Sequence, residues 1–209
     1  MTRIDSVAAQ ADRAGRYLVR FSDGTTMRLY SQTVQDFGLY TGMEMTEEAV
    51  AALREAAGQM SAKMRAVRIV AASNVSRADL EQRLVQKGES RQQAKEAVQW
   101  MEELELVDDR KTAQLVVHRC ASKGYGRARA KQMLYEKKIP KELWETVLED
   151  YPDQTDAIVT FLHSRLQGSW DQRDLKRAMD ALLRRGHSYG DIRQGLQQLQ
   201  LDADSFLEE

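Results

Sequence analysis

The chain has 209 residues, 42% of them hydrophobic and 30% charged, and only 2 Pro and 12 Gly interrupt a sequence rich in helix-forming residues. This composition and the net charge of −1 exclude a disordered chain and a uniformly basic nucleic-acid binder, and they predict a mostly helical protein of one or two domains or of several smaller units. The single cysteine excludes an internal disulfide and a cysteine-based zinc site, and the absence of an apolar leader or of an apolar run of about 20 residues predicts a cytoplasmic protein without membrane contact.

The first part of the chain, residues 1–45, predicts a small β-rich region. Residues 16–21 and 25–30 alternate between apolar and polar side chains on either side of a Ser-Asp-Gly turn, which is typical of a β-hairpin. A weaker strand near residues 4–8 would make a three-stranded sheet. A short helix is expected at residues 31–37.

A helical connector is expected over residues 46–59. Thr46 is a suitable N-cap, and the acidic residues that follow it favour the positive end of a helix dipole. The same pattern extends the helix to about Ala72, so the connector leads directly into the repeated part of the chain.

The remaining chain repeats a helical pattern. Equivalent leucines stand 50 and then 48 residues apart, at Leu84, Leu134 and Leu182, and apolar residues recur at helical spacing after each one. We therefore predict three tandem three-helix repeats, at residues 60–108, 109–152 and 153–201, followed by an acidic C-terminal tail at 202–209. Because one such unit cannot bury its apolar face alone, the repeats are expected to stack into a curved, elongated array. The predicted fold class is mainly α with a small N-terminal β-hairpin region.

Helix boundaries in the repeats carry their own signals. Ser76, Ser90 and Ser188 are predicted N-caps, since each precedes a helical pattern and is followed three residues later by Asp or Gln. Gly88 and Gly186 suit the left-handed residue that closes the preceding helix.

The near-zero net charge hides a basic block in the middle repeat. From Arg110 to Lys141 the sequence contains ten Lys and Arg residues and one acid, Glu136, a local charge of +9 with acidic stretches on both sides. Such a block is either a solvated face or a contact surface for phosphate or for an acidic protein. Charge alone leaves both interpretations open.

Helical geometry sorts these bases by face. At about 100° per residue, Lys111 and Arg119 lie opposite the apolar side of their helix. On the next helix Arg127, Lys131 and Tyr135 form a stripe at positions i, i+4 and i+8. A basic stripe with an aromatic residue suits a phosphate backbone or an acidic protein groove, and the alternative is that Tyr135 packs against a neighbouring repeat.

Other chemistry-bearing residues favour structure over catalysis. The turn Lys123–Gly126 has glycines that let backbone amides approach a partner closely, but it lacks the spacing of a nucleotide-binding Walker A loop. Cys120 belongs to the apolar face of its helix and points away from His118, so no metal pair forms there. Asp108-Asp109 stands where a helix cap is expected. We expect no enzyme activity, no cofactor and no metal.

Several weak motifs follow one another in a fixed order and spacing over about residues 60–200. They are Leu104-x-x-Val107-Asp108-Asp109 before Ala113, then Arg119 and Lys123-Gly124-x-Gly126, Leu134 with Lys137, and Leu182-x-x-Arg185-Gly186 with Ser188-Tyr189. In these motifs the sequence resembles the RecX family, the regulatory proteins of the bacterial RecA recombinase. The chain departs from the family at Lys138, where a glycine is usual, and at Thr112 and His187, which replace customary phenylalanines.

The resemblance implies a non-enzymatic protein that binds in the groove of the RecA filament on single-stranded DNA and spans neighbouring subunits. It would then inhibit ATP hydrolysis, strand exchange and filament growth. The expected RecA- and DNA-contact residues are Lys111, Arg119, Lys123, Arg127, Lys131, Tyr135, Lys137, Lys138, Arg184 and Arg185. We expect a monomer that meets DNA directly or through RecA. The alternative is a stand-alone DNA-binding helical repeat protein without a recombinase partner.

Overall fold

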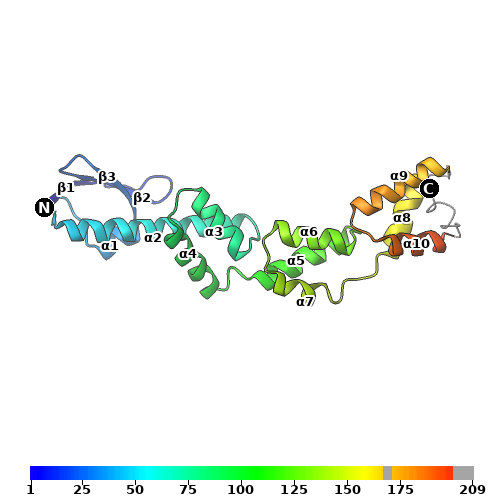
Figure 1. Ribbon diagram of the computed structural model, residues 1–209. Coiled ribbons are helices and arrows are strands. Elements are labelled where there is room, and N and C mark those ends of the chain that lie inside the picture. Colours follow the sequence, from blue (N-terminus) through cyan, green and yellow to red (C-terminus); the bar gives the residue numbers. More distant parts are fainter. Residues whose placement is uncertain (167–170, 200–209) are drawn as a thin grey trace. The chain divides into compact units, whose positions relative to one another are not determined.

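The computed structural model describes residues 1–166 and 171–199 and divides into two compact units, residues 1–107 and 108–209 (Figure 1). Both units contain bundles of helices, and the first also contains a small antiparallel sheet. The chain is therefore mainly helical, as its composition predicts. The predicted acidic tail at residues 202–209 lies outside the described residues.

The N-terminal sheet has four strands in the order β3-β2-β1-β4. The strands are β1 (Thr2–Val7), β2 (Arg16–Phe21), β3 (Thr26–Tyr30) and β4 (Glu44–Met45). The predicted hairpin is β2–β3, which is confirmed. The prediction of three strands is wrong, because β4 pairs with the start of β1. A two-residue strand is too short to show an alternating pattern, so this segment reads as a connector in the sequence.

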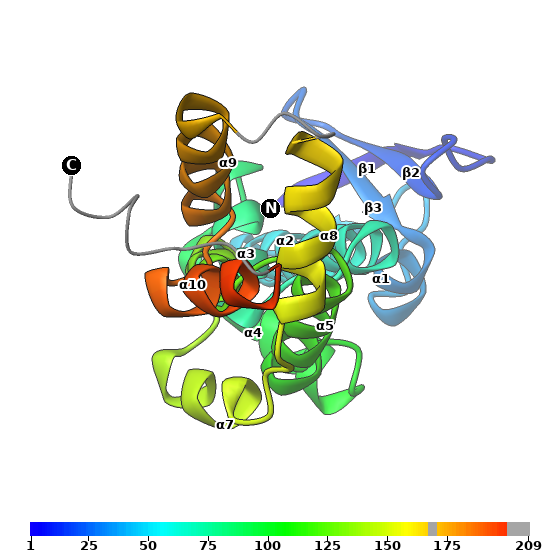
Figure 2. The same ribbon diagram turned by 90° about the vertical axis from the view of Figure 1, so that its right-hand side faces the viewer.

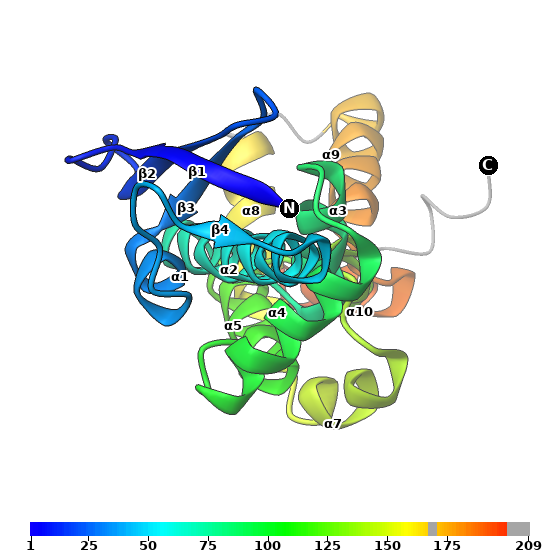
Figure 3. The same ribbon diagram turned by 90° about the vertical axis from the view of Figure 1, so that its left-hand side faces the viewer.

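Two helices cover the sheet, α1 (Ser31–Asp36) and α2 (Glu47–Ala72), as Figure 3 shows. Ile4, Phe21 and Leu29 from the strands pack with Leu53 of α2 in one buried cluster. The predicted cap of α2 is confirmed, since the Thr46 hydroxyl accepts a 3.1 Å hydrogen bond from the Ala49 amide. The sheet is thus anchored on the first half of α2.

The second half of α2 belongs to a different core. Ala62 and Ala66 of α2 are fully buried against α3 (Arg77–Gln86) and α4 (Arg91–Glu103). The helix runs without a break across the predicted boundary at residue 60, so one continuous element serves both the sheet and the first three-helix domain. The predicted caps Ser76 and Ser90 both accept hydrogen bonds from the amides three residues ahead.

The second unit contains a middle and a third three-helix domain. The middle domain is formed by α5 (Asp109–Ser122), α6 (Arg127–Glu136), a 3₁₀ turn (Lys141–Leu143) and α7 (Trp144–Leu148). The third contains α8 (Thr155–Leu166), α9 (Gln172–Arg184) and α10 (Tyr189–Gln198), which Figure 2 shows together. Each domain has its own buried cluster.

Equivalent residues of the three domains occupy equivalent places. Leu84, Leu134 and Leu182 are all fully buried, as expected if the repeats share one frame. The residue that ends the following turn has a left-handed backbone in each domain, with φ of 95° at Gly88, 55° at Lys138 and 88° at Gly186. Lys138 therefore adopts the glycine-like conformation of its counterparts, which a lysine adopts only at some steric cost.

Candidate functional site

The exposed stripe, defined as Arg127, Lys131 and Tyr135, follows one flank of α6. Both basic residues are exposed, and the Tyr135 side chain is 69% exposed. Tyr135 is therefore not part of the core of its own unit. On the same helix, Arg129 donates to Gln132 over 2.8 Å and Gln132 donates to Glu136 over 3.0 Å. The stripe presents two cations and an aromatic ring to solvent side by side.

The bases on α5 differ in how far they are neutralised. Lys111 and Arg119 are both exposed. The Lys111 ammonium lies 3.6 Å from the Asp108 carboxylate, which also accepts the Lys111 amide over 3.0 Å. This amide hydrogen bond lowers the pKa of the Asp108 carboxyl. Asp108 is therefore the predicted helix cap, and part of the Lys111 charge is balanced by it.

Four further predicted contact residues lie at the ends of helices. Lys123 follows α5 and is exposed, Lys137 and Lys138 follow α6 and are half-buried, and Arg184 is exposed at the end of α9. The structure thus leaves their charged ends at or near the surface of the second unit.

Arg185 is placed differently from the other predicted contact residues. Its guanidinium donates a 3.0 Å hydrogen bond to the Lys123 carbonyl and lies 5.3 Å from the Tyr125 ring and 4.9 Å from the Phe161 ring. The sequence predicts Arg185 beside Arg184 on a contact surface, whereas its head group joins the middle and third domains. Consecutive helical residues point about 100° apart, and this signal already separates the two arginines.

The glycine turn meets the same part of the third domain. The Gly126 amide donates to the Arg185 carbonyl over 3.0 Å, and the Ala128 amide donates to the Gly186 carbonyl over 3.2 Å. A Cβ on Gly126 would overlap the Gly186 carbonyl, so only glycine permits this approach. The sequence predicts that these amides approach a partner, and within the chain that partner is the third domain. We call the contact of residues 123–126 with residues 185–187 the junction.

His187 completes the junction from within the fold. It is 4% exposed, and its Nε2 lies 3.1 Å from the Gly124 carbonyl, which assigns the proton to Nε2. Its buried Nδ1 has no hydrogen-bond partner among the described residues. Burial lowers the pKa of the imidazole, a shift that the nearby Arg185 charge reinforces. Because position 187 is buried, the phenylalanine that is customary in the RecX family would also fit there.

Other candidate reactive groups are structural. Cys120 is fully buried, and burial raises the pKa of its thiol, so the thiol is inert as its helical face predicts. The Tyr151 hydroxyl donates a 2.7 Å hydrogen bond to the Tyr125 carbonyl, and burial raises its pKa to about 12. Among residues 1–166 and 171–199, the side chains form no metal-binding group and no helix is long and apolar enough to cross a membrane.

Comparison with known proteins connects this geometry to a family. Residues 108–148 match the family model described as RecX, second three-helix domain. A crystal structure of regulatory protein RecX superposes with a TM-score of 0.66 at 18% sequence identity, covering 92% of this chain and 98% of that one. A crystal structure of RecX from Lactobacillus salivarius superposes with a TM-score of 0.62 at 22% identity, covering 69% of this chain and 98% of that one. No curated protein sequence matches the chain.

The match and the superpositions establish different things. At identities below 25%, the two superpositions establish only the fold. Each of them covers almost the whole of the compared RecX chain. The family-model match adds sequence evidence for α5, α6 and α7, the domain that carries the exposed stripe. Taken together, the sequence of the middle domain matches the RecX family model, and the fold of the chain is that of the RecX crystal structures.

Proposed function

We propose that the protein is a non-enzymatic modulator of the RecA recombinase. It binds in the groove of the RecA filament on single-stranded DNA and lowers ATP hydrolysis, strand exchange and filament growth. It needs no cofactor and acts as a monomer in the cytoplasm. The match of residues 108–148 to the RecX family model, and the fold shared with a crystal structure of regulatory protein RecX, support this proposal.

The exposed stripe is the single observation that carries the proposed mode of binding. Arg127 and Lys131 are one helical turn apart and exposed, and Tyr135 follows one turn later with most of its ring in solvent. Cations attract the phosphates of a nucleoprotein filament over several ångströms, and an exposed aromatic ring offers a stacking or packing surface. The stripe also lies on the domain that matches the family model.

The proposed contact surface extends from the stripe along the middle domain. It includes the exposed bases on α5 and the bases that follow α5 and α6, with Arg184 as an extension on the third domain: Lys111, Arg119, Lys123, Arg127, Lys131, Tyr135, Lys137, Lys138 and Arg184. Arg185 is assigned to the junction because its guanidinium is already bonded there.

The first test is the DNA-dependent ATPase activity of RecA. Substoichiometric amounts of the purified protein should suppress hydrolysis and shorten filaments on single-stranded DNA. An unchanged hydrolysis rate together with an unchanged filament length would refute the proposed function.

The second test assigns the surface. Arg127→Glu with Lys131→Glu should raise the amount of protein needed for half-inhibition by about tenfold or more, because two attractive charges become repulsive. The matched control is Arg173→Glu with Lys176→Glu, which makes the same charge change at exposed positions of α9 outside the proposed surface. Equal loss of inhibition in both variants would assign the effect to net charge alone.

A second candidate function is direct DNA binding without a recombinase partner, favoured by the presence of an aromatic ring on the basic stripe. Binding to single-stranded DNA in the absence of RecA should then weaken steeply with salt, by about 0.7 log units of affinity per tenfold increase in salt for each phosphate contacted. A slope near zero would remove this candidate and leave the RecA filament as the target.

A further inference from the structure

The first unit contains a cavity in which half of the lining residues are cationic. It has a volume of about 430 Å³ and lies where the hairpin meets α2 and α3. Half of its ten lining residues are bases and none is an acid: Arg16, Tyr30, Ser61, Arg65, Arg68, Ile69, Ala72, Ser73, Arg83 and Lys87. We call this the cationic pocket. It belongs to the first unit and contains no residue of the exposed stripe.

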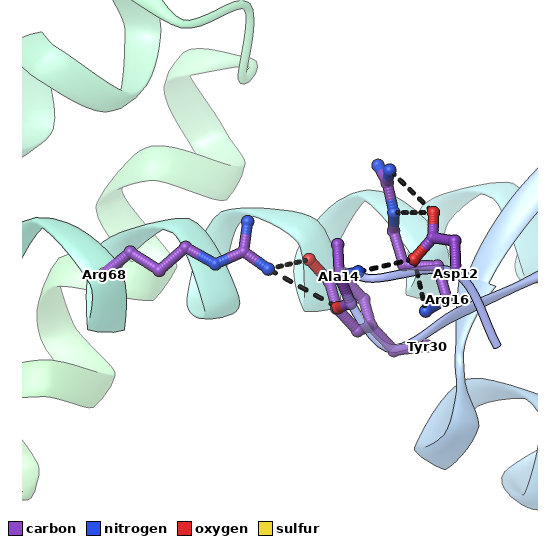
Figure 4. Close-up of polar contacts among 5 residues, drawn as sticks. All are labelled: Asp12, Ala14, Arg16, Tyr30 and Arg68. Atoms are coloured by element: carbon purple, nitrogen blue, oxygen red, sulfur yellow. Dashed lines mark hydrogen bonds and ion pairs between the residues drawn. The ribbon is translucent and has the colours of Figure 1, made fainter.

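Three of the five cations have carboxylate partners that are not among the lining residues of the pocket. Arg16 pairs with Asp12 over 2.9 Å, and the close-up in Figure 4 shows this pair. The other two pairs are Arg65 with Glu89 over 2.9 Å and Arg83 with Asp79 over 2.8 Å. These carboxylates do not line the cavity, so they hold the guanidinium groups in position without occupying the space between them.

The other two cations, Arg68 and Lys87, have no carboxylate partner among the described residues. The Arg68 guanidinium lies 3.5 Å from the Ala14 carbonyl and 3.3 Å from the Tyr30 hydroxyl, both neutral groups, and Figure 4 shows it extended toward them from α2. Lys87 is exposed, and its backbone carbonyl accepts a hydrogen bond from Arg65. The pocket therefore brings two uncompensated positive charges toward one space.

A neighbouring cavity extends the positive lining. Its volume is about 490 Å³, and it shares Arg16 with the cationic pocket and adds Arg13 and Arg28. The only acid in its lining is Asp12, which is already paired with Arg16. Cationic side chains thus line both neighbouring cavities. This arrangement suits a ligand that carries several phosphates in a row.

We propose that the cationic pocket binds the phosphate groups of a nucleic-acid strand or of a free nucleotide. Uncompensated cations around one space repel one another, and an anion relieves this repulsion while accepting charge-assisted hydrogen bonds. Arginine presents a planar fork of donors that matches a phosphate, so Arg68 supplies the directional contact and Lys87 a flexible one. The site needs no recombinase and shares no residue with the proposed contact surface of the second unit.

The test uses the full chain carrying Arg127→Glu and Lys131→Glu, so that the exposed stripe does not contribute. Fluorescence anisotropy would measure the binding of a fluorescein-labelled oligothymidylate, with ATP added as a competitor. Arg68→Gln with Lys87→Gln should weaken binding by about tenfold, because two charge-assisted hydrogen bonds are removed. The matched control is Arg91→Gln with Lys95→Gln, which removes the same charges from exposed positions of α4 outside the pocket.

The outcomes distinguish a nucleic-acid strand from a free nucleotide as the ligand, and they can refute the proposed site. Displacement of the oligonucleotide by ATP assigns the pocket to free nucleotides, and its retention assigns the pocket to a strand backbone. Equal binding by the pocket variant and the control variant would overturn the proposal, as would the absence of binding both of the oligonucleotide and of fluorescently labelled ATP. If circular dichroism shows that the double variant is unfolded, Lys87→Gln alone changes only an exposed side chain and should still weaken binding about threefold. No weakening in that variant would equally overturn the proposal.

Discussion

The exposed stripe and the junction are adjacent in the sequence but have different roles. Gly126 and Arg127 are consecutive residues, yet the first lies against the third domain and the second points to solvent. A block of like charge in a sequence is therefore not one surface. Part of the basic block lies at the contact between the middle and third domains, and the exposed remainder is available to a partner.

The two regions should differ in what they contribute to stability. The junction combines backbone hydrogen bonds with a half-buried guanidinium near two half-buried rings. The stripe consists of exposed side chains, whose interactions in water contribute little to folding. Variants of the junction should therefore lower the free energy of unfolding, and variants of the stripe should affect only binding.

The largest effect is expected for Gly126→Ala. The added Cβ overlaps the Gly186 carbonyl, so the two backbones must separate, and the free energy of unfolding should fall by about 3 kcal/mol. Urea unfolding of the full chain measures this. The control is Gly190→Ala in α10, where the new Cβ has ordinary contacts and alanine favours the helix, so stability should stay equal or rise. Equal stability of the two variants would contradict the close approach at the junction.

A smaller loss is expected when the junction arginine is shortened. Arg185→Ala removes a hydrogen bond to the Lys123 carbonyl and contacts with two rings, which together correspond to about 1–3 kcal/mol of unfolding free energy. Its neighbour Arg184 is exposed, so Arg184→Ala should change stability by less than about 0.5 kcal/mol. This pair of variants tests the placement of two consecutive arginines, and a reversed order of the two losses would show the assignment to be wrong.

The junction should also make stability depend on pH. Burial lowers the pKa of His187 in the folded state, so the unfolded chain takes up a proton first as the pH falls below about 6.5. The contribution of neutral His187 to the free energy of unfolding is complete above that pH and is lost as the pH falls toward the pKa of His187 in the folded state. The melting temperature should therefore drop through this window, and His187→Phe should reduce the drop, with the exposed His118→Gln as control. A drop of the same size in His187→Phe would exclude His187 as its source.

The smallest effect on stability is expected in the stripe. Arg127→Gln with Lys131→Gln should change the free energy of unfolding by no more than about 0.5 kcal/mol, because both side chains are exposed. The same variant should require more protein for half-inhibition of RecA. A loss of several kcal/mol in urea unfolding would mean that the stripe is part of the structure.

The repeated helices could be predicted from the sequence because their signals are local. Leucines at a fixed interval, serine caps and left-handed glycines such as Gly88 follow from helical periodicity and backbone sterics alone. The fourth strand could not be predicted in this way, since Glu44 and Met45 form a strand only through their contact with β1. Local rules therefore describe the domains better than the contacts that join them.

The candidate sites divide in the same way. The exposed stripe lies on one helix, so its spacing of four residues predicts it. The role of Arg185 depends on Tyr125 and Phe161, which come from two other segments. The cationic pocket combines Arg16 with Arg68 and Lys87 from distant parts of the chain, and no sequence window contains them together.

The most direct test of this account is binding to a preformed RecA filament on single-stranded DNA, measured by cosedimentation under conditions in which every variant is folded. Arg127→Glu with Lys131→Glu should lose binding, whereas Arg185→Ala should bind like the unmodified protein. If the stripe variant binds normally and Arg185→Ala does not, the surface that meets the filament is the junction side of the second unit, and the assignment made here is contradicted.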